Sequence, residues 1–281
     1  MKLRQNEDEQ GPAKGILALL RAVPGDFLVC LTFFTRLPAF LSVDHTRPMS
    51  RAAQMFPAIG LVIGIIGALV LSFGTMLQLP YYLISVLTIT AMIIATGALH
   101  EDGLADMIDG FGGGHDRERK LEIMKDSHIG TYGVLALLLS QVMRVILLAS
   151  LLPRGLDLAI TVLLAAQMIS RGYSMFLWAG LPPARSNGLS KQAGQPQRRA
   201  LVMALVTTSV ALLCLLLPNL NIIAILFATA LSGLVSYLMI VLCRGQIGGQ
   251  TGDTIGATQQ LCDLAFMTGI LISLGIAKEL L

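Results

Sequence analysis

Long apolar runs are the feature that most restricts what this chain can fold into. Six runs are long enough for a transmembrane helix, which needs about 20 mostly apolar residues. They cover residues 55–79, 81–99, 132–152, 157–181, 200–217 and 222–243, and a seventh, shorter run covers 264–276. No stretch alternates like a barrel strand, and lipid tolerates no unpaired backbone groups, so the runs predict helices.

The expected fold class is therefore all-α: a polytopic membrane helix bundle with about six to seven transmembrane helices. The composition agrees, because 54% of the residues are hydrophobic and 13% are charged, whereas a soluble domain carries about 25% charged residues. Residues 27–34 are apolar but too short to span, so we expect a short interfacial or re-entrant segment there. We expect a mobile tail at 1–26 and a single integral membrane domain at 27–281.

The basic residues lie on alternate sides of the predicted helices. The loops near 41–54, 101–130, 182–199 and 244–261 hold eleven Lys and Arg residues, whereas the opposite loops hold only Arg154. By the positive-inside rule, we expect the basic loops to face the cytoplasm. The expected location is the inner membrane, which the protein would cross several times. The N-terminal segment has no small-residue cleavage pattern after an apolar core, so we expect no removed signal peptide.

The overall charge and the cysteines exclude other classes of partner. A net charge of +3 gives no reason to expect a nucleic acid, so the expected environment is the lipid bilayer. The four cysteines lie in or beside apolar runs and show no Cys/His spacing. We therefore expect neither a zinc site nor a disulfide framework.

Acidic residues are concentrated in the segment 100–132, HEDGLADMIDGFGGGHDRERKLEIMKDSHIGTY. On a helix, Asp102, Asp106 and Asp109 share one face, and Glu122 and Asp126 repeat the same four-residue spacing. Like charges at this spacing repel one another, and a hard divalent cation with oxygen ligands would offset the repulsion. This pattern indicates a metal site on the basic, cytoplasmic side and chemistry on a phosphate-bearing substrate. The alternative is a solvated loop whose acids pair with neighbouring Lys and Arg.

Other residues are candidates for phosphate contact. Lys125 adjoins Asp126, while Arg144 and Arg171 lie inside predicted spans, where an ionised group is costly and usually faces a wet cavity or the bundle interior. The segment 248–256, rich in Gly and Thr, predicts a nest of backbone N–H groups or a helix start that holds phosphate. Its Asp253 has the alternative role of capping the next helix.

These motifs together resemble those of one family. The HEDGLADMIDG and LEIMKDSHIGTYG motifs are joined by FFTRLP at 33–38, FPAIG at 56–60, SRG at 170–172 and GGQTGDTIGA at 248–257. In this combination and order, from about residue 27 to 264, the chain is similar to the adenosylcobinamide-GDP ribazoletransferase, or cobalamin-5'-phosphate synthase, family. The resemblance implies a transferase of cobalamin nucleotide-loop assembly. It would join adenosylcobinamide-GDP and alpha-ribazole, or the 5'-phosphate of ribazole, with release of GMP.

The resemblance also implies roles for individual residues. The implied Mg²⁺ ligands are Asp102, Asp106 and Asp126, with Asp109 and Glu122 as further ligands, and either Glu122 or Asp126 would accept the proton of the ribose hydroxyl. The implied substrate-binding residues are Lys125, Arg171, Gly249, Thr251, Gly252 and Asp253. The implied partners are the corrinoid and ribazole substrates. A homo-oligomer and a complex with other enzymes of the corrinoid pathway both stay open.

Two other functions fit parts of the pattern. A CDP-alcohol phosphotransferase of lipid synthesis carries D-G-x-x-A-R, but here Ala105 comes one residue early and Asp106 stands next to it. A cation transporter would place acidic residues near the membrane midplane, whereas here they cluster in a long loop and at a helix end. Both features argue for the ribazole transferase.

Overall fold

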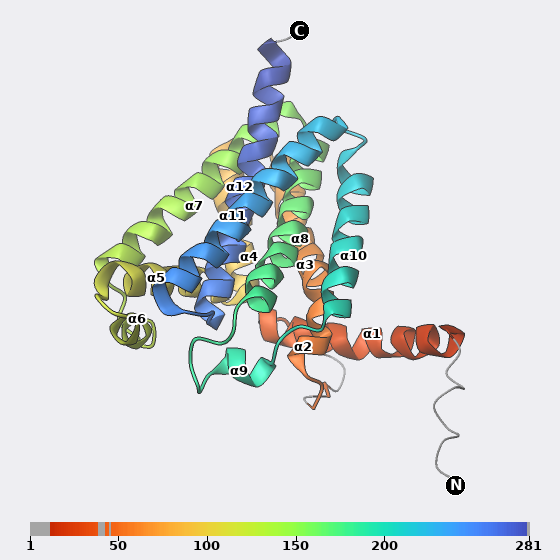
Figure 1. The fold of residues 1–281 in the computed structure, drawn as a ribbon. Helices are drawn as coiled ribbons and strands as arrows, with labels where there is room; N and C mark the ends of the chain where they lie inside the picture. The colour runs from red at the N-terminus through yellow and green to blue at the C-terminus, as the bar shows by residue number, and fades with distance from the viewer. Residues whose placement is uncertain (1–11, 39–42, 45, 280–281) are drawn as a thin grey trace.

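The computed structural model describes residues 12–38, 43–44 and 46–279, and these residues form a bundle of helices (Figure 1). The elements are α1 (Pro12–Phe34), α2 (Met49–Ala52), η1 (Ala53–Met55), α3 (Phe56–Met76), α4 (Tyr81–Thr96), α5 (Leu99–Gly113), α6 (Arg117–Ile123), α7 (Thr131–Leu151), η2 (Leu152–Arg154), α8 (Leu156–Gly180), α9 (Leu189–Ala193), α10 (Arg198–Leu216), α11 (Ile222–Ile247) and α12 (Gly252–Glu279). Within this described part the only β pairing is an isolated bridge between Pro183 and Gln250. The all-α prediction is confirmed.

Six stretches are long and apolar enough to cross a membrane, and the number is seven if the bent pair α4 and α5 is counted as one span. The six are Met49–Met76, Thr131–Arg154, Leu156–Gly180, Arg198–Leu216, Ile222–Ile247 and Gly252–Gly275. The prediction of six to seven spans is confirmed. The expected extent of the last span was wrong, because the helix begins at Gly252, well before the apolar run at 264–276.

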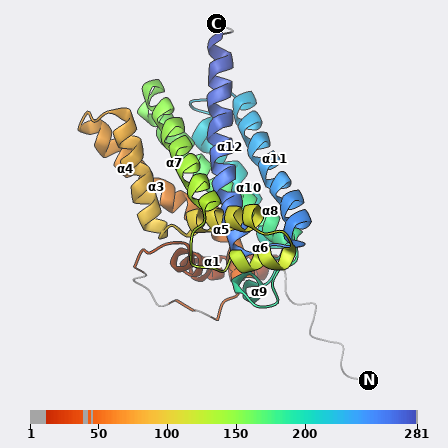
Figure 2. The same cartoon turned by 90° about the vertical axis from the view of Figure 1, so that its left-hand side faces the viewer.

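A sharp turn between α4 and α5 places the acidic segment across the end of the bundle. Gly97 and Ala98 both adopt left-handed conformations, with φ of 64° and 58°. This conformation suits Gly97 and is uncommon at Ala98. The turn rotates α5 by 88° relative to α4, so α5 runs across the end of the bundle beneath α7 and α12 and not along the spans (Figure 2).

The N-terminal helix α1 lies nearly perpendicular to the bundle (Figure 1). Its apolar part, Val23–Phe34, is shorter than a span, which agrees with the interfacial segment expected at 27–34. Buried Asp26 ties it to the loop before α2 and to η1 by accepting from Arg47 Nη1 at 2.9 Å and from Gln54 Nε2 at 3.0 Å. Residues 12–26 of the expected tail are helical, and 1–11 lie outside the described residues.

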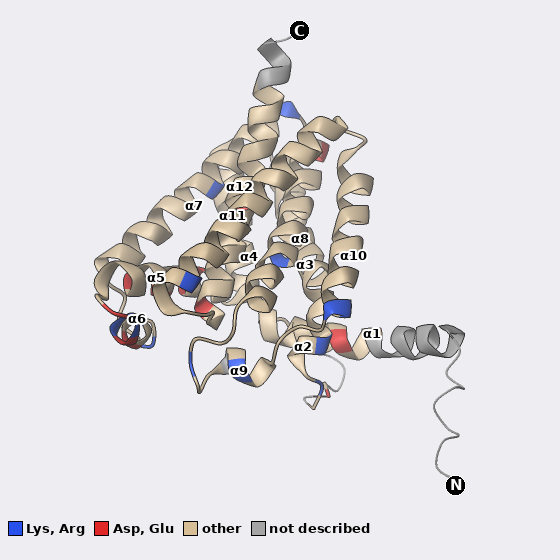
Figure 3. Ribbon diagram, viewed as in Figure 1, with Lys and Arg blue, Asp and Glu red and all other residues tan. Residues whose placement is uncertain are grey.

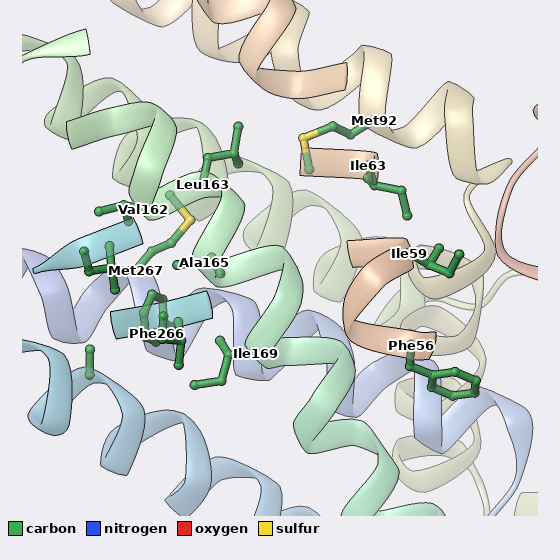
Figure 4. Close-up of a cluster of buried hydrophobic side chains, with 14 of the residues drawn as sticks. Phe56, Ile59, Ile63, Met92, Val162, Leu163, Ala165, Ile169, Phe266 and Met267 are labelled. Atoms are coloured by element: carbon green, nitrogen blue, oxygen red, sulfur yellow. The ribbon is translucent and has the colours of Figure 1, made fainter. Parts of the chain in front are cut away.

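The core centres on α8 and α12, the two most buried spans. Their side chains meet α3 and α4 in a cluster that includes Phe56, Ile59, Met92, Ile169 and Phe266 (Figure 4). The spans around this core expose apolar side chains on their outer surfaces, as lipid-facing helices do.

A stripe of glycines brings α3 and α8 close together. A Cβ at Gly60 would lie 2.2 Å from the carbonyl oxygen of Gln167, and Gly64 and Gly67 face the side chains of Leu164 and Leu163 on the same helix. Small residues at this spacing permit close helix approach in membranes.

Charged residues gather at the end of the bundle where α5, α6 and α9 lie (Figure 3).

Candidate functional site

The carboxylates of α5 differ in their exposure to solvent. Asp102 is exposed, Asp106 is half-buried, and Asp109 is 7% exposed. Gly103 lies against the start of α12, since a Cβ there would come within 2.8 Å of the backbone oxygen of Asp253. The missing side chain therefore lets α5 and the N-terminus of α12 touch, which places Asp102 and Asp106 beside Asp253.

The start of α12 is capped by its own threonines. The Thr254 N–H donates to Thr251 Oγ1 at 3.3 Å, and the Thr251 N–H donates to Thr254 Oγ1 at 2.9 Å. Thr251 Oγ1 also donates to Asp253 Oδ2 at 3.1 Å. Thr251 is therefore the cap of α12, which leaves the carboxylate of Asp253 to face the α5 side. The predicted helix start at 248–256 is confirmed.

Arg185 is the cation at this junction, and it was missed from the sequence. Its Nη1 lies 3.6 Å from Asp253 Oδ2, and its Nη2 donates to the Leu121 carbonyl at 3.1 Å. Arg185 lies between α8 and α9, in a polar loop that carries no recognisable phosphate motif. Only the folded chain places this loop beside α12.

Asp106 is partly buried at this junction, near other carboxylates and Arg185. Burial, followed by the carboxylates of Asp102, Asp253 and Asp109, raises the pKa of Asp106 to about 7, although Arg185 opposes the shift. Crowded carboxylates raise one another's pKa in this way. A bound divalent cation would relieve the repulsion and keep these groups ionised.

Asp109 has a structural role that sequence reasoning missed. Its Oδ2 accepts from the Gly130 N–H at 2.7 Å, and its Oδ1 accepts from the Gly133 N–H at 2.8 Å. Gly130 is the residue before the first turn of α7, so a carboxylate of α5 caps α7. Both oxygens are engaged by backbone groups, which leaves Asp109 poorly placed to bind a metal.

Glu122 and Asp126 lie apart from this group. Their four-residue spacing would place them on one face of a helix, but α6 ends at Ile123 and Asp126 lies beyond it. Glu122 is exposed and pairs with Arg119 at 2.7 Å. Asp126 is exposed and pairs with the His128 ring at 2.7 Å, a hydrogen bond that lowers the pKa of Asp126. Lys125 between them is exposed.

A cavity of about 600 Å³ opens beside the junction. Asp102 and Gly103 of α5 line it together with Gly252, Asp253 and other residues of the first turn of α12. Its remaining walls come from α1, α3, α8, the loop before α2 and α9, and they include several aromatic side chains. Carboxylates and a helix N-terminus therefore share one cavity with an apolar wall.

Arg171 lines the same cavity from α8. It is 2% exposed, and its Nη1 donates to the side-chain oxygen of Gln167 at 2.8 Å. Among the described residues, nothing accepts a hydrogen bond from its Nε. A buried guanidinium with a free donor is suited to an anionic ligand.

Arg144 does not reach the cavity but holds a buried network behind it. Its Nη1 lies 3.1 Å from Glu101 Oε1 and its Nε lies 3.2 Å from Asp263 Oδ2. Gln260 donates to Glu101 at 3.0 Å, and Gln167 donates to Asp263 at 2.7 Å. The network links Arg171 to Glu101, the residue before Asp102. Asp263 was missed, although an acid directly before the apolar run 264–276 was the available signal.

Gly249, one of the expected substrate-binding residues, is buried and does not line the cavity. A Cβ there would lie 2.5 Å from the Pro182 carbonyl oxygen. The neighbouring Gln250 N–H donates to that oxygen at 2.9 Å, and the Gln250 carbonyl accepts from the Ala184 N–H at 2.8 Å. This pairing fixes the loop of Arg185 beside α12. Gly252, by contrast, is exposed and lines the cavity.

The carboxylates at this junction do not form a complete metal cage. No three Asp, Glu, His or Cys side chains among the described residues stand close enough together to hold an ion. Mg²⁺ is usually bound through one or two carboxylates plus substrate phosphates. The hard oxygens of Asp102, Asp106 and Asp253, with their unrelieved repulsion, fit that pattern.

Comparison with known proteins gives a consistent family match. Residues 26–271 match the model of the family described as cobalamin-5-phosphate synthase. A protein of Azorhizobium caulinodans named adenosylcobinamide-GDP ribazoletransferase is 43% identical over 88% of this chain and 95% of its own. Proteins of the same name from Mesorhizobium japonicum and Brucella ovis are 42% and 37% identical, over 88% and 89% of this chain and 93% and 97% of theirs. No solved structure matches.

Proposed function

This chain belongs to the cobalamin-5-phosphate synthase family, and we infer that it is the transferase that joins adenosylcobinamide-GDP to ribazole in nucleotide-loop assembly. The family match selects this function over the CDP-alcohol phosphotransferase and the cation transporter. The chain is a multi-pass membrane protein by its spans. The transfer therefore requires a site in the bundle that polar substrates can reach from water.

The observation that carries the mechanism is the shared cavity at the junction of α5 and α12. Asp102 and Asp253 line it together with Arg171 and the first turn of α12. A diphosphate needs cations and N–H donors around it as charge moves onto the leaving group. We propose that Arg171 and the N-terminus of α12 bind the diphosphate of the donor, with Arg185 close by.

Two of the three carboxylates of Asp102, Asp106 and Asp253, completed by phosphate oxygens of the substrate, are the proposed ligands of Mg²⁺. When bound together with diphosphate oxygens, the ion would neutralise charge on the transferring phosphoryl group and on the departing phosphate. The carboxylates would hold the ion beside the cavity, close to the bound diphosphate. Asp253 joins the ligands in place of Asp109, whose oxygens cap α7.

The transfer itself exchanges one phosphorus–oxygen bond for another. The acceptor ribose hydroxyl attacks the phosphorus on the cobinamide side, the new ester bond forms, and the bond to GMP breaks. The hydroxyl proton passes to a protein carboxylate, and the electron pair of the broken bond leaves on GMP. The proposed proton acceptors remain Glu122 and Asp126.

Of these two, the structure favours Asp126. Both side chains are exposed, and each has a partner, Arg119 for Glu122 and His128 for Asp126. Asp126, however, lies in the segment that leads to Gly130, which Asp109 holds against α5. Comparing kcat for Asp126→Asn and Glu122→Gln tests this choice. A larger loss in Glu122→Gln would reverse it.

The proposed orientation follows from the charges. Charged residues gather at the end of the bundle that carries the cavity (Figure 3), and the opposite end carries Arg154 and Asp157. By the positive-inside rule we propose that the cavity opens to the cytoplasm from an inner membrane. Both substrates would then reach it from the same compartment.

The direct test of the function is GMP release by the purified protein in lipid nanodiscs. We expect release only when adenosylcobinamide-GDP, ribazole and Mg²⁺ are all present, and a loss of at least about a hundredfold in Asp102→Asn. Asp157→Asn is the matched control, because Asp157 lies in the first turn of α8 at the opposite end of the bundle. Absence of release by folded wild-type protein would refute the function, and full activity of Asp102→Asn would refute the site.

A further inference from the structure

A chain of aromatic rings forms one wall of the cavity. The His100 and Phe34 rings stack with their centroids 5.6 Å apart, Phe34 meets Phe56 edge-on at 4.6 Å, and Phe56 stacks with Trp178 at 5.6 Å. All four rings line the cavity, and each is at most 5% exposed. They come from α5, α1, α3 and α8, so four elements hold the wall in place.

The Phe34, Phe56 and Trp178 rings of this wall line the cavity and offer it no free hydrogen-bonding group. The indole N–H of Trp178 already donates to the Gly194 carbonyl at 2.8 Å, and the phenylalanines have no polar atom. A base such as guanine, rich in donors and acceptors, would lose its hydrogen bonds to water against this surface. A planar heterocycle with an apolar edge loses far fewer and gains ring contact.

The other side chains around the cavity match the remainder of a nucleoside. Asp102, Asp253 and Arg171 line the same space as the rings, so a bound base would have its sugar within the cavity that holds the proposed phosphate and metal groups. The volume of about 600 Å³ lies in the range that encloses a drug-sized ligand. A corrin ring that carries a nucleotide is far larger than that.

We propose that the wall formed by Phe34, Phe56, His100 and Trp178 binds the benzimidazole base of the ribazole acceptor and directs its ribose toward the carboxylates of α5 and α12. This inference rests on the proposed function and names the substrate that enters this cavity. The corrin of the donor then lies outside the cavity, with only its diphosphate reaching the junction. The wall therefore determines which base the enzyme attaches.

The single tryptophan of the chain gives a direct binding signal. We expect ribazole alone, without donor, to change Trp178 emission in a saturable way in nanodisc-embedded protein excited beyond the absorption band of the benzimidazole. GMP and ribose 5-phosphate are the control ligands and should leave the emission unchanged. A saturable response to GMP and none to ribazole would overturn the assignment, because the wall would then hold the guanine of the donor.

Kinetics of a ring-removing variant test the same point through turnover. We expect Phe56→Leu to raise KM for ribazole about tenfold and to leave KM for adenosylcobinamide-GDP within about twofold of wild type. Phe73→Leu is the matched control, since Phe73 lies on the same helix but is 59% exposed on its outer surface. Phe34→Leu provides a second variant of the wall if Phe56→Leu does not fold.

The dependence of the KM effect on the size of the base gives a further test, because a general structural defect would affect both ribosides equally. The Phe56→Leu effect should shrink for a riboside of plain imidazole, which lacks the fused ring that would contact the wall. An equal effect on both ribosides, or a rise in KM for the donor alone, would overturn the proposal. If the wild type releases GMP but neither the Trp178 response nor the Phe56→Leu effect is seen, the acceptor site is refuted and the function stands. Absence of GMP release would refute the function itself.

Discussion

The buried charged residues of the network around Arg144 are held by partners of opposite charge or by hydrogen bonds. Arg144 lies between Glu101 and Asp263, and Asp263 also accepts from Gln167, which in turn binds Arg171. Removing one member of a buried pair leaves a charge without compensation, which costs more than the pair contributes. The network is therefore expected to be more sensitive to single changes than to changes that remove opposite charges together.

Arg144→Met should lower the free energy of unfolding by about 3–5 kcal/mol, because Glu101 and Asp263 would then stay buried without their cation. Thermal unfolding in detergent measures the loss. Adding Glu101→Gln and Asp263→Asn to Arg144→Met should restore part of the stability. A triple variant less stable than the single one would show that the network does not act through charge pairing.

At the scale of single residues, the sequence predicted the site residues that stand out from their neighbours along the chain. Asp102 stood out because it shares a helical repeat with other acids, and Arg171 because it interrupts an apolar run. Arg185 and the aromatic wall carry no such pattern. Arg185 reaches Asp253 across 68 residues only after α8 and α12 pack, so no spacing along the chain predicts it.

At the scale of elements, α5 is held in position at three points. The turn at Gly97 sets its direction, Gly103 lets it touch the start of α12, and Asp109 anchors it to the start of α7. These contacts place the carboxylates on a fixed helix and not on a mobile loop. Precise placement of the reacting groups is worth a large factor in rate.

Gly103→Ala should therefore lower kcat/KM about tenfold or more while the bundle stays folded. The added Cβ would meet the Asp253 backbone and push α5 away from α12. Steady-state GMP release measures the loss, with Gly245→Ala as control, because nothing lies within 4 Å of a Cβ at Gly245. Equal activity of the two variants would show that close contact between α5 and α12 is not required.

The sequence alone does not predict where some helices begin and end, because contacts in the folded chain set these boundaries. The run 81–99 looks like one span, but the left-handed residues at 97 and 98 end it and turn the chain. The glycine-rich start of α12 looks unlike a membrane helix, yet it is helical because Thr251 and Thr254 cap it and α5 covers it. Periodicity predicted the existence of the helices, whereas tertiary contacts set these ends.

At the scale of the whole molecule, charged residues are concentrated at one end of the bundle and are few at the other (Figure 3). The polar end carries the cavity, α5, α6 and α9, while the other end carries short connections between spans (Figures 1 and 3). Most of the charged residues therefore lie at the end where the substrates would bind. The proposed orientation makes that end cytoplasmic.

Cysteine labelling tests the orientation in a variant whose four native cysteines are replaced by alanine. In inside-out inner-membrane vesicles, we expect a membrane-impermeant maleimide to label Ser186→Cys and not Arg154→Cys, because these exposed positions lie at opposite ends of the bundle. Right-side-out spheroplasts should give the opposite pattern. Labelling of Arg154→Cys in the inside-out vesicles would place the cavity outside the cytoplasm.

The central claim is that Asp102 of α5 and Asp253 of α12 belong to one catalytic site, and a double-mutant cycle on kcat/KM for GMP release tests it most directly. When two groups act as one unit, removing either of them already causes most of the loss in rate. Removing the second as well therefore lowers the rate little further. We predict that Asp102→Asn/Asp253→Asn falls no more than about threefold below the weaker single variant. A double variant whose loss equals the product of the two single losses would contradict the claim.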